Sequence, residues 1–204
     1  MVVTAGEQAI RRNRGRCICA FAIYIIGYIA IFFAGAGGSE GQSPTPLSEY
    51  QVKAAFLFHF AQMVEWPADT LGPDTRPMIF CTTGEDGIAA ALEAIVPGKQ
   101  IATHPIELRR VNSKADFQDC HLVFIGGRDS RRALSIVNRL QDSSVLLVGE
   151  SEGFAQQGGA IEFLLQNNKV RFDINVSAAQ RARLKISSRL LLLARTVIDS
   201  GKAG

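Results

Sequence analysis

Two glycine-rich stretches contain the residue types that bind anions. Gly126-Gly127-Arg128 follows an apolar run, and Arg131 comes about one helical turn later. Free N–H groups at the start of a helix, together with arginine side chains, can hold a phosphate or a carboxylate. Gly84–Gly87 also follows an apolar run and would lie at the same edge of a parallel sheet. Neither stretch matches a complete dinucleotide or P-loop motif, so two ordinary turns remain the alternative to a ligand site.

A lysine and a phenylalanine interrupt the pattern of a predicted first helix. Ser48-Glu49-Tyr50-Gln51 fits a capping box, and Pro67 ends the helical run. Lys53 falls within the apolar arc, where it either extends its amine to solvent or pairs with a buried anion. Phe58 falls in the polar arc, either as a single exposed aromatic residue or as part of a docking surface. Lys53 therefore joins the ligand-binding candidates, and Phe58 joins the docking candidates.

Catalytic and metal-binding patterns are absent from the sequence. It contains no Gly-x-Ser-x-Gly, no His-Glu-x-x-His and no close carboxylate pair. The three histidines, His59, His104 and His121, do not have the spacing of metal ligands. We therefore predict a binding protein with no catalytic residues, no metal and no cofactor.

Residues 1–36 have the composition of an export signal. Four arginines between Arg11 and Arg16 precede the apolar run Cys17–Ala34, which contains no charged residue. The run closes on Ala34-Gly35-Ala36, a small-x-small pattern that signal peptidase accepts. The segment is either a cleaved signal peptide or an uncleaved anchor, and both place residues 37–204 outside the cytoplasm. Residues 37–47 are rich in Gly, Ser and Pro and are predicted to be a flexible linker.

Export changes the meaning of the charge and cysteine counts. Of the 22 basic and 19 acidic residues, four arginines and one glutamate lie in residues 1–36, which leaves 18 of each. A neutral domain gives no support for nucleic-acid binding. Cys81 and Cys120 are the two cysteines that follow the signal. An even pair in an oxidising compartment predicts a disulfide between them.

The next part of the chain alternates strands and helices. Strands are predicted at Met78–Thr82, Ile101–Val111, His121–Ile125 and Ser144–Val148, and helices at about Asp86–Val96 and from Asp129 to about Leu140. This alternation favours a parallel sheet. Ala160–Leu165 and Lys169–Ile174, joined by Gln166-Asn167-Asn168, then predict a hairpin that makes the sheet mixed.

A long helix over about Ser177–Ser200, capped by Asn175, is predicted to end the fold. Its core stripe would be formed by residues spaced at helical intervals: Ile186, Leu190, Leu193 and Val197. The predicted fold is a single α/β domain over residues 48–200. It has a mixed, mostly parallel sheet flanked by helices, with a C-terminal β-hairpin and this long final helix.

The opposite face of the predicted final helix carries basic residues around one apolar residue. Arg181, Lys185 and Arg195 share this face with Leu192. An apolar centre with a polar rim suits a protein interface, although a solvated helix face is the alternative. We therefore predict that a protein partner binds these four residues, joined by Phe58.

Several motifs resemble those of the YfiR-like periplasmic proteins. The first runs from Tyr50-Gln51-Val52-Lys53-Ala54-Ala55-Phe56-Leu57-Phe58-His59-Phe60 to Val64-Glu65-Trp66-Pro67. The others are Val123-Phe124-Ile125, Val170-Arg171-Phe172-Asp173-Ile174-Asn175 and Leu184-Lys185-Ile186-Ser187-Ser188-Arg189-Leu190-Leu191. The resemblance covers most of Ser48–Ser200, and Cys81 and Cys120 lie where members of this family carry a structural disulfide. The additional cysteine pair of those members, nearer the C-terminus, is absent from this sequence.

This resemblance implies a periplasmic repressor without catalytic activity. Such proteins bind the periplasmic sensor region of an inner-membrane diguanylate cyclase of the YfiN type, which lowers cyclic-di-GMP and biofilm formation. The resemblance also implies a homodimer. The alternative function is a periplasmic sensor whose glycine loops bind a nucleotide-like or aromatic metabolite.

Overall fold

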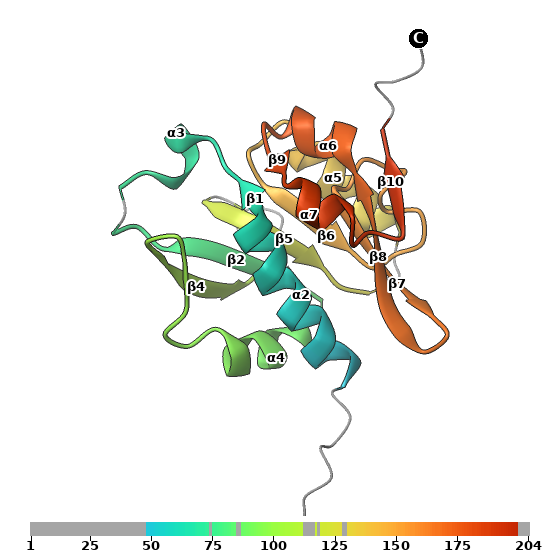
Figure 1. The fold of residues 1–204 in the computed structure, drawn as a ribbon, viewed down its shortest axis with the longest axis horizontal. Coiled ribbons are helices and arrows are strands. Elements are labelled where there is room, and N and C mark those ends of the chain that lie inside the picture. The colour runs from blue at the N-terminus through green and yellow to red at the C-terminus, as the bar shows by residue number, and fades with distance from the viewer. Residues whose placement is uncertain are drawn as a thin grey trace, which may run out of the picture. The chain divides into compact units, whose positions relative to one another are not determined.

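The computed structural model describes residues 48–199, apart from 74, 85–86, 112–116, 118 and 128–129 (Figure 1). The predicted export signal and linker lie outside the described residues, so the division into 1–36, 37–47 and 48–200 stays a prediction. Within the described part, no helix is both long and apolar enough to cross a bilayer.

A mixed eight-stranded sheet forms the centre of the described domain, in the order β10-β8-β7-β6-β5-β2-β4-β3. Its strands are β2 (Met78–Thr83), β3 (Gln100–Ile101), β4 (His104–Arg110), β5 (Cys120–Ile125), β6 (Leu146–Gly149), β7 (Ile161–Gln166), β8 (Lys169–Asn175) and β10 (Thr196–Ile198). The run from β4 through β2, β5 and β6 to β7 is parallel, whereas β8 is antiparallel to β7 and β3 to β4. The predicted α/β class with a mostly parallel, mixed sheet is confirmed.

Helices cover both faces of this sheet. They are α2 (Glu49–Met63), α3 (Ala68–Leu71), α4 (Ile88–Ile95), α5 (Ser130–Leu140), α6 (Val176–Arg181) and α7 (Ser188–Leu191). On one face, Phe60 of α2 and Leu92 of α4 belong to a buried cluster that includes Phe124 of β5. On the other face, Val137 of α5 packs in a second cluster with Leu147 of β6. The central strands β2 and β5 are buried along their whole length because both faces are covered.

Helix α2 begins where the capping box predicts. The Ser48 hydroxyl accepts a hydrogen bond from the Gln51 N–H, and the Gln51 side chain accepts one from the Ser48 N–H. Further along, the Phe60 ring lies 4.9 Å from Phe172 and 5.5 Å from Phe163, between ring centroids. These aromatic contacts hold α2 against the hairpin of β7 and β8. The hairpin itself turns through Asn167 and Asn168, both with positive φ, which is the conformation of a type I′ turn.

The predicted disulfide between Cys81 and Cys120 is present. Cys81 lies in β2 and Cys120 begins β5, the neighbouring parallel strand, with their Cα atoms 5.9 Å apart. Both residues are buried in the cluster on the α5 face, beside Phe117 and Val123. The bridge therefore joins two central strands inside the core.

The predicted long helix over Ser177–Ser200 is wrong. The chain instead forms α6, β9 (Lys185–Ile186), α7 and β10. Arg183, which follows the C-cap residue of α6, adopts a left-handed φ of 58°, and β9 then pairs antiparallel with β1 (Val64–Glu65). Tertiary strand pairing therefore overrides the helical spacing of the apolar residues. Two residues of the predicted core stripe, Leu193 and Val197, are exposed as a result.

Removing the disulfide should destabilise the domain. We expect the double substitution Cys81→Ser and Cys120→Ser to lower the free energy of unfolding by about 2–5 kcal/mol, because it frees a 39-residue loop in the unfolded chain. Urea denaturation with and without dithiothreitol measures the effect. Reduction should destabilise the wild type by a similar amount and leave the double variant unchanged. An equal response of both proteins to reduction would contradict a structural role of this bridge.

Candidate functional site

The carboxyl ends of β2 and β5 form the point at which the strand order reverses. In the sheet, β2 lies between β4 and β5. After β2 the chain forms β4 on one side of β2, and it then crosses back to form β5 on the other side of β2. Open α/β sheets bind ligands in the crevice that such a reversal leaves. The predicted glycine loops follow these two strands, so the two loops lie at the same edge of the sheet, as predicted.

Helix α2 closes this edge with a buried ion pair. Lys53 is only 4% exposed, and its Nζ donates a hydrogen bond to the Glu150 carboxylate, which follows β6. The other oxygen of Glu150 accepts the Gly127 N–H at 2.7 Å. An internal carboxylate therefore occupies the backbone donor that the sequence suggested for a ligand anion. Lys53 is also paired with Glu49 one turn earlier in α2.

The charge on Lys53 is maintained in spite of its burial. Burial lowers the pKa of the amine, but the hydrogen bonds and charges of Glu150 and Glu49 outweigh it, so that the pKa is raised overall. Lys53 therefore remains protonated at neutral pH. The hypothesis that Lys53 pairs with a buried anion agrees with this geometry, and the anion belongs to the protein itself.

Tyr50 packs against the other glycine loop. A Cβ atom added at Gly87 would lie 2.6 Å from the Tyr50 ring, so any side chain at this position would displace the ring. Tyr50 and Lys53 thus cover the ends of β2, β5 and β6 from one face of α2. Sequence reasoning missed Glu150, although an acidic residue directly after a buried parallel strand is a usable signal for this edge.

The remaining ligand candidates do not complete an anion site among the described residues. Arg128 lies outside the described residues, and Arg131 is exposed on α5. Gly126 donates its N–H to the Thr83 carbonyl, which joins the ends of β5 and β2. Of the predicted set, the structure brings together Lys53 and Gly127, through Glu150.

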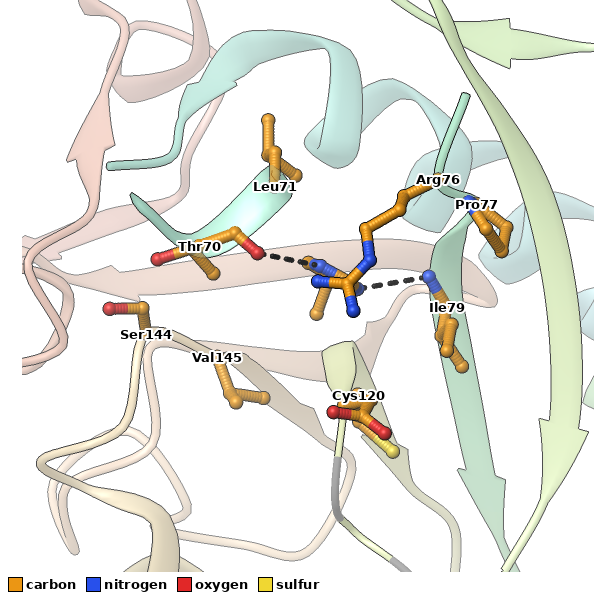
Figure 2. A pocket seen from close by; sticks show the side chains of 10 residues that line it. Thr70, Leu71, Arg76, Pro77, Ile79, Cys120, Ser144 and Val145 are labelled. Carbon is orange, nitrogen blue, oxygen red and sulfur yellow. Dashed lines mark hydrogen bonds between the residues drawn. The ribbon is translucent and has the colours of Figure 1, made fainter. Parts of the chain in front are cut away.

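A separate cavity of about 300 Å³ opens at the opposite, amino-terminal edge of the sheet (Figure 2). Its lining combines apolar and polar residues, among them Leu71, Arg76, Ile79, Cys120, His121 and Ser144. His121 accepts the Ile79 N–H on Nδ1 at 3.0 Å, so Nε2 carries the proton and points to the Thr70 carbonyl. Burial lowers the pKa of this imidazole, and the nearby His104 and Arg76 lower it further, which together outweigh the hydrogen bond to the Thr70 carbonyl.

The predicted docking residues have different environments. Arg195 forms a two-point ion pair with the buried carboxylate of Asp173 and thereby fixes the start of β10 against β8. Lys185 pairs with Glu65 across the two short strands β9 and β1. Arg181 is exposed at the end of α6. Leu192 is 86% exposed, the most exposed large apolar side chain in the described part of the chain.

The prediction of an exposed Phe58 is wrong. Phe58 is only 8% exposed and belongs to the core cluster on the face of α2 and α4. The Lys99 ammonium, beyond the end of α4, lies 4.7 Å from the centre of the Phe58 ring. Helix α4 packs beside α2, so the arc that the sequence pattern assigned to solvent is covered. Phe58 therefore cannot share a docking surface with Leu192.

A model of one protein family matches residues 50–195, described as YfiR/HmsC-like (DUF4154). The match begins at Tyr50 and includes α2, the whole central sheet apart from the last strand, and α7. The chain belongs to the YfiR/HmsC-like family. This is a regulatory family, not a catalytic one, and its members are periplasmic.

A solved structure shares the fold of this YfiR/HmsC-like domain at low sequence identity. A conserved domain protein from Vibrio cholerae O1 biovar El Tor is 11% identical, with a TM-score of 0.50 over 74% of this chain and 60% of that protein. An ABC domain from Streptococcus pneumonia, solved in complex with L-Trp, is 12% identical, with a TM-score of 0.47 over 70% of this chain and 60% of that one. The chain thus spans about 60% of the length of each structure. The likeness to the Vibrio protein concerns the fold alone.

The YfiR/HmsC-like domain should lose stability in mild acid through His121. Its pKa is lowered from 6.5 in the folded state, so protons bind the unfolded chain first and the free energy of unfolding falls as the pH drops below about 6.5. Protonation at Nδ1 would also remove the acceptor of the Ile79 N–H. His121→Asn retains an acceptor without titrating, so its stability should depend less steeply on pH between about 6.5 and 5.

Urea denaturation at a series of pH values measures this dependence. His59→Asn, at an exposed histidine of α2, is the matched control and should follow the wild type. Parallel curves for the wild type and His121→Asn across the same interval would show that His121 does not titrate on unfolding.

Proposed function

We propose that this protein is a periplasmic repressor of an inner-membrane diguanylate cyclase. In this role it binds the periplasmic sensor region of the cyclase, which lowers cyclic-di-GMP and limits biofilm formation. The family match over residues 50–195 carries the proposal. Among the residues that the structure describes, no group of histidine, cysteine, aspartate and glutamate side chains is suited to holding a metal.

The closed carboxyl edge favours a protein partner over a small ligand in the glycine loops. Glu150 occupies the Gly127 N–H, and Tyr50 packs on Gly87, so a metabolite would first have to displace internal contacts. A repressor needs only to bind the inactive state of its receptor more tightly than the active state. A difference of about 3 kcal/mol shifts that equilibrium by more than a hundredfold.

The docking surface in this proposal centres on the segment that follows α7. Leu192 and Leu193 are 86% and 59% exposed, and Arg189 of α7 is exposed beside them in the sequence. Arg181 and Lys185 add positive charge on the preceding elements. Exposed leucines with a basic surround have the composition of an interface centre with a polar rim. Arg195 contributes mainly by holding this segment to Asp173.

Leu192→Asp should release the cyclase without unfolding the repressor. The side chain is 86% exposed, so the substitution places a charge at the docking centre and removes no core contact. We expect cellular cyclic-di-GMP to rise towards the level of a strain lacking the repressor, and the cyclase to be lost from pull-downs of the full chain. Leu165→Asp, at a 48% exposed leucine near the end of β7, is the matched control and should repress normally.

The melting temperature of the purified variant separates docking from folding. A wild-type melting temperature together with lost repression supports the surface. Normal repression and normal cyclase capture by Leu192→Asp would exclude Leu192 from the interface.

A further inference from the structure

The cavity at the amino-terminal edge of the sheet is separate from the proposed docking surface. Its volume of about 300 Å³ is at the lower end of the range for small-ligand sites. Its walls come from α3, the start of β2, the start of β5 and the residues before β6 (Figure 2). Arg183 joins two of these walls, because its guanidinium donates hydrogen bonds of 2.9 Å to Asp69 of α3 and to Ser144 before β6. The cavity is therefore built from distant segments that are held together.

Much of the cavity wall is aliphatic. Leu71, Ile79 and Val145 contribute branched apolar side chains, and the last two of these residues are buried. The His121 ring also lines the cavity, but its two nitrogens already contact the Ile79 N–H and the Thr70 carbonyl. No phenylalanine, tyrosine or tryptophan is found among the described lining residues. This lining therefore suits a branched aliphatic group better than an aromatic ring.

Two residues of opposite charge line the same cavity. Arg76 lies shortly before β2 and Asp119 directly before β5, and both residues are exposed. Within the described part of the chain, neither Arg76 nor Asp119 forms an ion pair with another side chain. Figure 2 shows the Arg76 guanidinium directed towards the other lining residues. A ligand with a carboxylate for Arg76 and an ammonium group for Asp119 would complement both charges.

Neighbouring residues fix the position of Arg76. The buried His104 ring donates a hydrogen bond from Nδ1 to the Arg76 carbonyl at 2.9 Å, since a carbonyl can only accept. A Cβ atom added at Gly72 would lie 2.9 Å from Cδ of Arg76, so the glycine leaves room for this side chain. The same glycine has a positive φ of 67°, which a larger residue rarely adopts. Arg76 is thereby held in place before a ligand arrives, which lowers the entropy that binding costs.

We propose that this cavity binds a free aliphatic α-amino acid of the size of leucine. The carboxylate of the ligand pairs with the Arg76 guanidinium, and its ammonium group pairs with the Asp119 carboxylate. The aliphatic side chain of the ligand packs against Leu71, Ile79 and Val145. An α-amino acid carries all three groups on one carbon atom, so a single small molecule satisfies the two charges and the apolar wall. The inference does not depend on the proposed repressor function, because it rests on the cavity alone.

Calorimetric titration of the wild-type full chain tests the class of ligand. We expect L-leucine to bind with saturation. Isocaproate is leucine without its ammonium group, and isoamylamine is leucine without its carboxylate. Each should bind at least about tenfold more weakly than L-leucine, because it leaves one charge of the cavity without a partner. L-phenylalanine should also bind more weakly, since the wall is aliphatic. This comparison uses the wild type alone, so it does not depend on the folding of any variant.

Two substitutions at the exposed charges test the location of the site. Arg76→Gln and Asp119→Asn should each weaken the binding of L-leucine at least about tenfold. Asp119→Asn should also remove the preference for L-leucine over isocaproate, because the ammonium group has lost its partner. Arg76→Gln should remove the preference for L-leucine over isoamylamine. Arg110→Gln, at an exposed arginine near the carboxyl end of β4, is the matched control and should bind L-leucine as the wild type does.

Three results would overturn the proposal. The first is the lack of saturable binding of L-leucine by the wild type. The second is a wild type that binds isocaproate, isoamylamine or L-phenylalanine as tightly as L-leucine. The third is L-leucine binding that is unchanged in both Arg76→Gln and Asp119→Asn, which would place the ligand outside this cavity.

Discussion

The ion pair between Lys53 and Glu150 is the contact on which the arrangement of the domain depends. Their side chains are 5% and 16% exposed, so both charges are largely removed from water. Such burial is costly unless each charge finds a partner and its remaining hydrogen bonds. Here Glu150 also accepts a hydrogen bond from the Gly127 N–H, and Lys53 also forms an ion pair with Glu49. These interactions offset the free-energy cost of burying each of the two charges. The pair fixes the first turns of α2 over the loops that follow β5 and β6.

This constraint determines which surfaces of the domain can act. In a parallel α/β sheet the reversal of strand order usually leaves an open crevice for a ligand. Here α2 fills that position with Tyr50 and Lys53, both part of the motif that carries the resemblance to the YfiR-like proteins. Large exposed apolar side chains lie elsewhere, on Leu192 and Leu193 after α7, where the docking surface is proposed. A domain of this design suits binding to other proteins.

Local signals in the sequence predicted much of the fold. The capping box at Ser48 predicts the start of α2, and the apolar runs predict the central strands β2 and β5, because these patterns depend on few distant contacts. The cysteine pair could be predicted because the compartment and the count left a single pairing. The structure of the last segment could not be predicted, because its apolar residues have helical spacing. Two contacts with distant parts of the chain decide its structure: β9 pairs with β1, and Arg195 forms an ion pair with Asp173. The prediction that Phe58 is exposed failed for a similar reason. A helical wheel of α2 considers that helix alone, whereas α4 packs beside it and covers Phe58.

A double-mutant cycle on Lys53 and Glu150 tests the central claim most directly. The free energy of unfolding would be measured by urea denaturation for Lys53→Met, Glu150→Gln and the double variant, with Lys185→Met and Glu65→Gln as the matched surface cycle. The closed edge predicts a coupling energy of about 2 kcal/mol or more for the buried pair. The exposed pair should give about 1 kcal/mol or less. Additive effects at Lys53 and Glu150, within about 0.5 kcal/mol, would contradict the view that this contact closes the sheet.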